Sequence, residues 1–495
     1  MGDENTQLGD AEARHLLRRT GFGVNEKTLT KILSENETRG QAADRLLNFT
    51  PSKFRPRARD IELAHNKWIK YMVRTKTELA EKLTLFWHDH FATSIAVVGN
   101  TTLMANQNQL FRLSCKGNFK SFVKAINLDP AMMEFLDTVR NRRQQPNENY
   151  PRELQELFCL GVTDLTAAAE PNYDQEDIVQ IARAFTGWRY DDQGQPYFTE
   201  GRHDYDEDYL AERGPKVIFK NRGGFGDPNG QDFTINGEGE PEIDAVTDII
   251  FQHKDSEGKN TVARHITHRL LTYFAYSDPE LSVIDDIVAT SGFDTDFELA
   301  PLLRAIFCHD AFFETMAPAP FEPTTKKSVK WPIDFVVGTL RTIKMKAKGK
   351  YQFIDGGRFG ELRERLTDMG QRLFEPPSVF GWDWEDGWLS STTLLARYAF
   401  VRDATSARGP GGSSFRPERL FDLTETVPGN VVDAVTDLLG VTAQITSSDR
   451  DVLIDYLTNG AGAGSSVDLL DDDFRDEKLN GLVALVLQSP VYQLH

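Results

Sequence analysis

Two histidines lie close together in residues 86–91, Phe-Trp-His-Asp-His-Phe, and imidazole is a common metal ligand. His88 and His90 would share a face if the backbone were extended, since side chains two residues apart in a strand point the same way. In a regular helix they would lie about 200° apart and would not converge. The apolar neighbours favour a helix, so either the helix breaks here or only one histidine faces a site. The alternative is a pair of partly buried histidines in an aromatic core.

Carboxylates and amides are dense in residues 147–157, Asn-Glu-Asn-Tyr-Pro-Arg-Glu-Leu-Gln-Glu-Leu. Pro151 suits the first position of a helix, which places Glu153 at the third position of a capping box. Glu153 and Glu156 would then share a helix face, as ligands or as an acid–base pair. The alternative is a first helical turn whose carboxylates complement the helix dipole, with Arg152 in an ordinary salt bridge. The polar residues before the helix, Glu148 among them, favour a site at its N-terminus.

Three further segments carry chemistry-bearing side chains. His203, beside Asp204 and followed by Lys216, could supply a base and an electrophile, although a solvated acidic loop is the alternative. His265 borders the apolar stripe of residues 262–274, as a ligand or as a hydrogen-bonded interface residue. Residues 376–388 hold three tryptophans, which could form a stacking platform for sugars or a packed loop over the core.

Helical periodicity dominates the elements that must position these residues. Apolar residues recur with a helical period in 176–188, 262–274 and 361–374, whereas strand-like alternation is confined to 188–235. We therefore predict a mainly α fold, in which a large multi-helix domain spans 1–405 and carries a small irregular or β insertion near 188–235. A linker is expected at 406–416, and acidic helices at 417–495 are expected to pack back on the main domain.

Composition excludes several classes of protein. The 495-residue chain has a formal net charge of −19, which disfavours binding to nucleic acid or to anionic membranes. No apolar run is long enough for a membrane span, and the N-terminus lacks the order of a signal peptide, so we expect a cytoplasmic protein. Three scattered cysteines exclude a disulfide framework and a cysteine zinc site. Aspartate outnumbers glutamate and arginine outnumbers lysine, which is typical of proteins from halophilic organisms, archaea included.

An ordered set of motifs resembles one family, the bacterial and archaeal family catalogued as domain of unknown function 1800. The matching segments are 15–23 (HLLRRTGFG), 85–93 (LFWHDHFAT), 129–132, 147–154, 182–188, 203–204, Lys216, His265, 376–382 (PPSVFGW) and 489–493. They run in family order over nearly the whole chain. The family has no settled activity, but the resemblance implies that its polar motifs, at His88, His90, 147–153, His203 and His265, form one site.

These observations together predict a metal-dependent enzyme. The expected ligands of a divalent Zn, Mn or Fe ion are His88, His90, Glu153 and His265. Glu148 or His203 would act as acid or base, and Lys216 or Arg152 would stabilise negative charge. Hydrolysis of a small molecule or glycan is expected first and oxidation second. The rival prediction is a non-catalytic scaffold or a glycan-binding protein that uses the tryptophans of 376–388. A third hypothesis, phosphate handling, rests on Arg18, Arg19 and Arg152.

Overall fold

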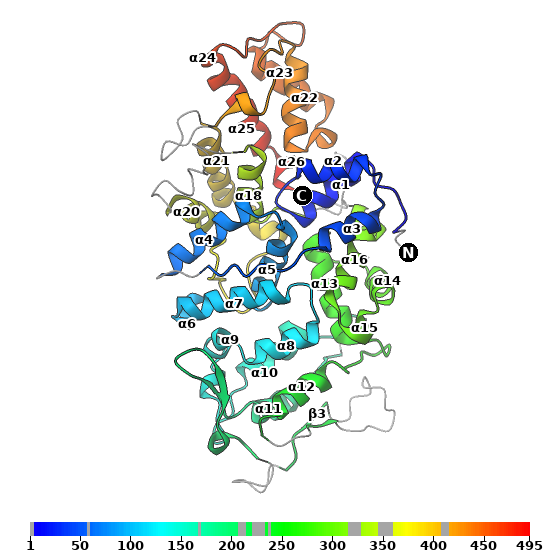
Figure 1. The fold of residues 1–495 in the computed structure, drawn as a ribbon, viewed down its shortest axis with the longest axis vertical. Helices are drawn as coiled ribbons and strands as arrows, with labels where there is room; N and C mark the ends of the chain where they lie inside the picture. Colours follow the sequence, from blue (N-terminus) through cyan, green and yellow to red (C-terminus); the bar gives the residue numbers. More distant parts are fainter. Residues whose placement is uncertain are drawn as a thin grey trace.

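A computed structural model describes residues 4–56, 60–166, 170–205, 214–219, 233–235, 239–314, 328–344, 360–406 and 415–495. The fold is mainly α, as predicted, and the helices form one elongated body (Figure 1). Among the described residues, no helix has both the length and the apolar character that crossing a bilayer would require.

The first half of the chain builds the middle and lower parts of this body (Figure 1). Its helices are α1 (Asp10–Thr20), α2 (Glu26–Ser34), α3 (Arg39–Leu47), α4 (Ile61–Arg74), α5 (Glu78–His90), α6 (Ile95–Val98), α7 (Thr101–Ser114), α8 (Phe119–Asn127), α9 (Pro130–Phe135), α10 (Asn149–Glu153) and α11 (Gln175–Ala184). Short 3-10 turns lie at η1 (Thr138–Arg140), after α9, and at η3 (Glu200–Arg202), within the insertion. The element η2 (Leu154–Cys159) is a π-helix that continues α10.

The predicted insertion contains two small antiparallel sheets. Strand β1 (Trp188–Tyr190) pairs with β2 (Pro196–Phe198), with Arg189 opposite Tyr197. Strand β3 (Val217–Ile218) pairs with β4 (Phe233–Thr234). The β insertion near 188–235 is therefore confirmed in the residues that are described there.

The second half completes the body and adds its upper end (Figure 1). Its larger helices are α12 (Glu242–Ile250), α13 (Thr261–Phe274), α14 (Leu281–Ser291), α15 (Phe293–Asp296), α16 (Leu299–Cys308), α17 (Asp310–Phe313), α18 (Pro332–Thr342), α20 (Gly360–Asp368), α21 (Ser391–Thr405), α22 (Pro428–Leu439), α23 (Ser447–Thr458), α24 (Asp472–Phe474), α25 (Asn480–Gln488) and α26 (Pro490–Gln493). Short 3-10 turns lie at η6 (Glu385–Trp388), η8 (Pro417–Arg419) and η9 (Thr442–Gln444), and η10 (Arg475–Leu479) is a π-helix between α24 and α25.

The helices after residue 417 pack against α21, where the Gln488 side chain donates to the Tyr398 carbonyl oxygen at 3.3 Å. Residues 407–414 of the predicted linker lie outside the described residues. The chain ends in the centre of the molecule, beside α1 and α2 (Figure 1).

Two local predictions need correction. The helix expected to start at Pro151 begins at Asn149, because Glu148 already serves as its N-cap, so Glu153 ends the α-helix and is not a capping-box residue. The helix expected over 361–374 stops at Asp368, because Gly370 adopts φ +93° and turns the chain before Pro376 is reached.

Candidate functional site

Helix α5 is buried on all sides, and its polar residues connect it to distant parts of the chain. All residues from Leu79 to His90 are buried. His88 Nε2 accepts the backbone N–H of Phe374 at 3.0 Å. Asp89 accepts the backbone N–H of Trp382 at 2.7 Å and the indole N–H of Trp384 at 3.1 Å. Both residues therefore hold the segment that follows α20 against the core.

His90 and His265 approach each other but bind the backbone of the π-helix. Their ring centroids are 6.3 Å apart. His90 Nε2 lies 3.1 Å from the carbonyl oxygen of Phe158, and His265 Nε2 lies 3.1 Å from that of Leu157. A π-helix alters the regular backbone pairing of a helix, and buried carbonyl oxygens need partners. The two imidazoles supply those partners.

Burial sets the charge state of these groups. Burial lowers the pKa of His88 to about 3, so its imidazole is neutral and can accept a hydrogen bond at neutral pH. Burial raises the pKa of Asp89 to about 6, although Arg269, Trp382 and Trp384 favour the ionised carboxylate. Arg269 lies 3.5 Å from Asp89 Oδ2 and stacks on the Trp384 ring.

The tryptophan-rich loop packs against the core. Trp382 and Trp388 are buried, and only Trp384 is partly accessible. Gly381 adopts φ +87°, and a Cβ atom there would lie 2.3 Å from Asp89 Oδ1. The loop therefore approaches α5 too closely for any other residue. Its buried tryptophans do not offer the exposed stacking platform that glycan binding would need.

The carboxylates around α10 remain near the surface. Glu148 accepts the Gln175 amide at 2.7 Å and lies 3.4 Å from Arg152, and both members of that ion pair are about 40% exposed. Glu153 is half-buried, and burial together with the nearby Glu156 raises its pKa to about 7. These residues make an ion-pair cluster with one carboxyl that titrates near neutrality.

His203 and Lys216 meet at a third location, around Glu242. His203 Nδ1 lies 2.8 Å from the Thr186 carbonyl oxygen, and its Nε2 lies 3.2 Å from Glu242 Oε1. Lys216 Nζ lies 3.0 Å from the same carboxylate. All three side chains are buried, so this cluster joins the insertion to α12.

The structure does not gather the predicted site residues into one centre. The Nε2 atoms of His88, His90 and His265 face backbone groups, while His203 and Lys216 share the Glu242 carboxylate. Within the described ranges, no group of three or more His, Cys, Asp or Glu residues could hold a metal ion. The expected four-ligand set of His88, His90, Glu153 and His265 therefore does not fit a single ion here, and the identity of any metal stays a prediction.

Two neighbouring cavities lie elsewhere, around the turn Gly21-Phe22-Gly23 that follows α1. A cavity of about 520 Å³ and a neighbouring cavity of about 760 Å³ share Gly23, Asn25, Lys27, Lys76 and Glu78 in their linings. We call these two cavities together the outer cleft. Gly23 has φ +102°, and a Cβ atom there would lie 3.1 Å from Thr342 Oγ1, so the turn requires glycine.

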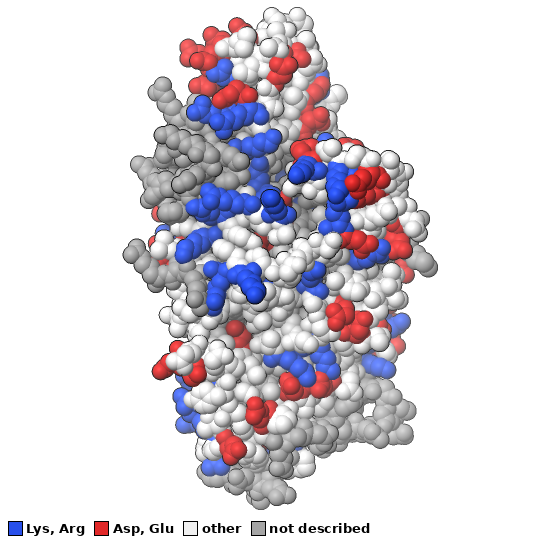
Figure 2. Space-filling model, viewed as in Figure 1, with Lys and Arg blue, Asp and Glu red and all other residues white. Residues whose placement is uncertain are grey.

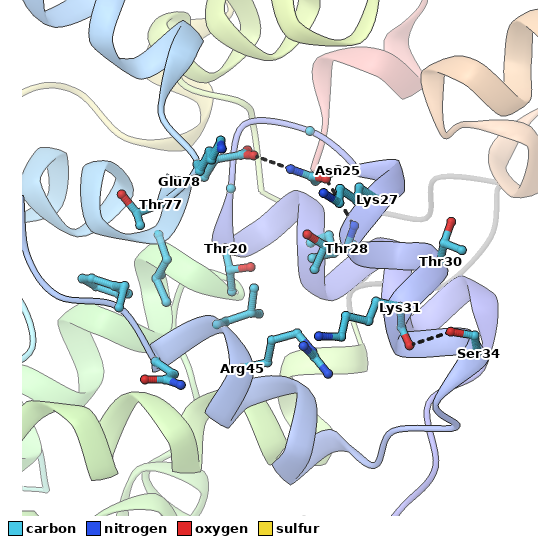
Figure 3. Close-up of a pocket in the computed structure, with 18 residues that line it drawn as sticks. Thr20, Asn25, Lys27, Thr28, Thr30, Lys31, Ser34, Arg45, Thr77 and Glu78 are labelled. Carbon is cyan, nitrogen blue, oxygen red and sulfur yellow. Dashed lines mark hydrogen bonds between the residues drawn. The ribbon is translucent and has the colours of Figure 1, made fainter.

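Basic side chains predominate in the outer cleft. Lys27 and Lys31 come from α2 and Arg45 from α3 (Figure 3). Lys76 comes from the residues before α5. Arg45 pairs with Glu35 and Glu37, whereas Lys27 and Lys76 make no ion pair with any described residue. Figure 2 shows Lys and Arg gathering over the middle of one face, where α1 to α3 meet α4 and α18.

Glu78 lines the outer cleft, but its carboxylate is bonded to other groups of the protein. Its carboxylate accepts the backbone N–H of Phe22 at 2.9 Å and the Asn25 amide at 3.3 Å, and it pairs with Arg341 (Figure 3 shows the Asn25 bond). Glu78 thus fixes the turn and does not cancel the charge of Lys27 and Lys76.

A third and much smaller cavity adjoins the outer cleft. It measures about 30 Å³ and shares Phe22, Gly23, Val24, Thr342 and Leu438 with the larger of the two cavities. We call it the inner chamber. Its charged and polar lining residues are Arg18, Lys330, Asp334, Tyr492 and His495.

Ionised groups crowd the inner chamber. Asp334 pairs with Lys82 Nζ at 2.7 Å and lies 3.4 Å from His495 Nε2. Burial opposes ionisation of Asp334, but Lys82 and His495 outweigh it and lower the pKa to about 2. Burial and the neighbouring Arg18 lower the pKa of Lys330, whose Nζ donates to the Tyr492 carbonyl oxygen at 2.8 Å. A cavity of this kind, with strongly shifted pKa values, is typical of a functional site.

The comparison with known families now becomes informative. A family model described as a protein of unknown function, DUF1800, matches residues 15–494. The chain belongs to the DUF1800 family. A search of the curated proteins and of the solved structures finds no match to this chain.

Sequence reasoning missed most of the cleft residues of this DUF1800 member. Lys27, Lys76 and Lys330 stand in no recognisable motif, and Asp334 and His495 are isolated among apolar residues. One available signal was Arg18 in the motif HLLRRTGFG, which was weighed for phosphate handling. The glycines of the same motif form the turn on which the cavities meet.

Proposed function

We propose that this protein binds an anionic small molecule in the outer cleft. The observation that carries the proposal is the pair Lys27 and Lys76, which line both of its cavities and make no ion pair with a described residue. The two carboxylates in the linings have other partners, because Glu26 pairs with Arg14 and Glu78 with Arg341. The chain has a net charge of −19, so most of its surface repels anions. A positively charged cleft on such a protein is where an anion would bind.

Backbone geometry supports the same ligand class. The first turns of α2 and α5 both line the outer cleft, through Lys27 and Thr28 and through Glu78 and Leu79. Asn25 already caps α2 by accepting the Thr28 N–H, whereas α5 has no side-chain cap. The start of a helix carries a partial positive charge, and its free N–H groups favour anions such as phosphate. The cavity of about 520 Å³ has the size of a small-molecule site.

The experiment is a thermal-unfolding series with pyrophosphate, phosphate and the neutral sugar maltose at constant ionic strength. Ligand that binds only the folded protein raises its stability, by about 2.7 kcal/mol at a hundred times Kd. We expect pyrophosphate to raise Tm, maltose to leave it unchanged, and the double variant Lys27→Ala/Lys76→Ala to lose the effect.

The matched control removes the same charge from elsewhere on the surface, in Lys53→Ala/Lys259→Ala, because both of these lysines are exposed and outside the cleft. The proposal fails if no anion shifts Tm, or if the control pair loses the shift as completely as the cleft pair.

A further inference from the structure

Asp334 and His495 form a buried pair in the inner chamber. His495 Nε2 lies 3.4 Å from Asp334 Oδ2, which places the hydrogen of a neutral imidazole on Nε2 and the lone pair on Nδ1. The Nδ1 atom is buried and has no hydrogen-bond partner among the described residues. A carboxylate that orients a histidine whose other nitrogen is uncommitted is the arrangement of a general base.

The backbone holds this pair rigidly. The N–H of His495 donates to the Ser328 carbonyl oxygen at 2.9 Å, and the N–H of Lys330 donates to that of Gln493 at 2.8 Å. Val329 and Leu494 form the bridge between these two bonds. Asp334 lies in the first turn of α18, and its second contact, to Lys82, fixes the carboxylate from the side of α5.

The inner chamber has the size and polarity for one water molecule. Its volume of about 30 Å³ exceeds the roughly 10–15 Å³ that one water needs. Three residues of its lining have a buried polar atom without a hydrogen-bond partner in the described part of the chain, namely Arg18 Nε, Asp334 Oδ1 and His495 Nδ1. An ordered water usually bonds to two to four such groups.

Two basic side chains, Arg18 and Lys330, line the same chamber. Arg18 binds the Gly440 carbonyl oxygen, and Lys330 lies over the Tyr492 ring, 3.6 Å from its centroid. Both line the inner chamber, and Gly23 lines the inner chamber as well as both cavities of the outer cleft. Arginine and lysine beside a reacting phosphoryl group stabilise the charge on its oxygens.

We propose that the inner chamber is a hydrolytic site for phosphate esters, in which His495, oriented by Asp334, activates water against an ester bound in the outer cleft. This inference rests on the proposed anion binding. The water oxygen forms a bond to phosphorus while the bond from phosphorus to the leaving alcohol oxygen breaks. One water proton passes to His495 Nδ1 and then to the leaving oxygen, so that inorganic phosphate and an alcohol are the products.

The surrounding charges suit each step. Burial and Arg19 lower the pKa of His495, which keeps its imidazole unprotonated at neutral pH. Ionised Asp334 stabilises the imidazolium that forms, and Arg18 and Lys330 stabilise the phosphoryl oxygens.

The test is hydrolysis of p-nitrophenyl phosphate by the full chain, with no residues added after His495. We expect turnover in the native protein, and a decrease in kcat of about 100-fold or more in His495→Gln with KM little changed. In His495→Gly, added imidazole should restore part of the activity, which a purely structural role of His495 would not allow. The cleft variant Lys27→Ala/Lys76→Ala should raise KM and leave kcat nearly unchanged.

The outcomes separate the two proposals. Pyrophosphate binding without any hydrolysis of p-nitrophenyl phosphate would overturn the hydrolytic site and leave anion binding intact. Equal turnover in His495→Gln and the native protein would also overturn it. Hydrolysis of the neutral ester p-nitrophenyl acetate alone would reject phosphate esters as the substrate class. Absence of both binding and turnover would overturn both proposals.

Discussion

The region around α5 and the region around the Gly21–Gly23 turn are both rich in polar residues, but the partners of these residues differ. Around α5, His88, Asp89 and His90 each meet a backbone or indole partner. At the turn, Lys27 lacks an ion pair and His495 Nδ1 lacks a hydrogen bond within the described structure. A polar side chain whose partners all lie within the protein stabilises the fold, whereas one with spare capacity can meet a ligand.

This difference gives opposite expectations for substitutions. Changes at α5 should reduce stability strongly, and changes in the outer cleft should affect binding with little cost in stability. The tests below run from the largest expected effect to the smallest.

Asp89→Ala should have the largest effect. It removes the acceptor of the Trp382 and Trp384 N–H groups and leaves Arg269 beside an apolar side chain. Loss of one partner of a buried, hydrogen-bonded ion pair costs about 3–5 kcal/mol. Urea unfolding followed by tryptophan fluorescence measures the loss, with the exposed Glu364→Ala as control. A loss below about 1 kcal/mol for Asp89→Ala would contradict the structural role of α5.

Acidification should destabilise the protein through its buried imidazoles. Burial lowers the pKa of both His65 and His88 from 6.5 to about 3, and the pKa values of His15, His90 and His495 also fall well below their usual range. The unfolded chain therefore binds more protons below pH 6.5, and each histidine removes roughly 2 kcal/mol of stability between pH 7 and pH 5.

Two buried carboxyls act in the opposite direction. The pKa values of Asp89 and Asp129 are raised by burial, to about 6 and about 7, so these groups favour the folded state as the pH falls. The five histidines outnumber them, and we expect a net loss of several kcal/mol between pH 7 and pH 5. Urea unfolding at both pH values measures it, and His88→Gln should reduce the slope. A stability that rises towards pH 5 would contradict the burial of these histidines.

Gly381→Ala should have an intermediate effect. A left-handed φ costs a non-glycine residue about 1–2 kcal/mol, and the new Cβ would also meet Asp89. Gly99→Ala is the matched control, because Gly99 has φ +65° but nothing lies within 4 Å of its Cβ position. The difference between the two variants in urea unfolding isolates the contact with α5. Equal losses would show that the loop can move away from Asp89.

Lys27→Ala/Lys76→Ala should change the free energy of unfolding by no more than about 0.5 kcal/mol, since both side chains are exposed and without ion pairs in the described structure. Urea unfolding without ligand measures this value. A large loss would mean that the outer cleft, like α5, serves the fold.

Metal content should not differ at all between the native protein and His265→Gln. The Nε2 atom of His265 lies 3.1 Å from the Leu157 carbonyl oxygen, and no described group of three potential ligands surrounds this histidine. Elemental analysis of both purified proteins measures the content. Near-stoichiometric metal in the native protein that is absent from His265→Gln would support the predicted metal centre.

Periodicity predicted the helices well because an apolar stripe is a local property. The stripe expected over 262–274 is α13, and the one over 176–188 contains most of α11. Sequence could not show what each polar motif contacts. His88 meets Phe374, which is 286 residues away, and that partner is a backbone group that any residue type would offer. The inner chamber was equally hidden, since Arg18, Asp334 and His495 come from three separate segments.

The contacts of α5 with residues 374–384 also bear on how the chain reaches its native state. Contacts between residues nearly 300 positions apart raise the contact order. Closing such a long loop costs conformational entropy, and the chain loses this entropy before the contacts can stabilise the fold. Until residues 374–384 have emerged from the ribosome, the buried groups of α5 lack their partners. Nascent chains of this protein should therefore depend on chaperones for most of their synthesis, and a fragment that ends before residue 374 should not fold stably.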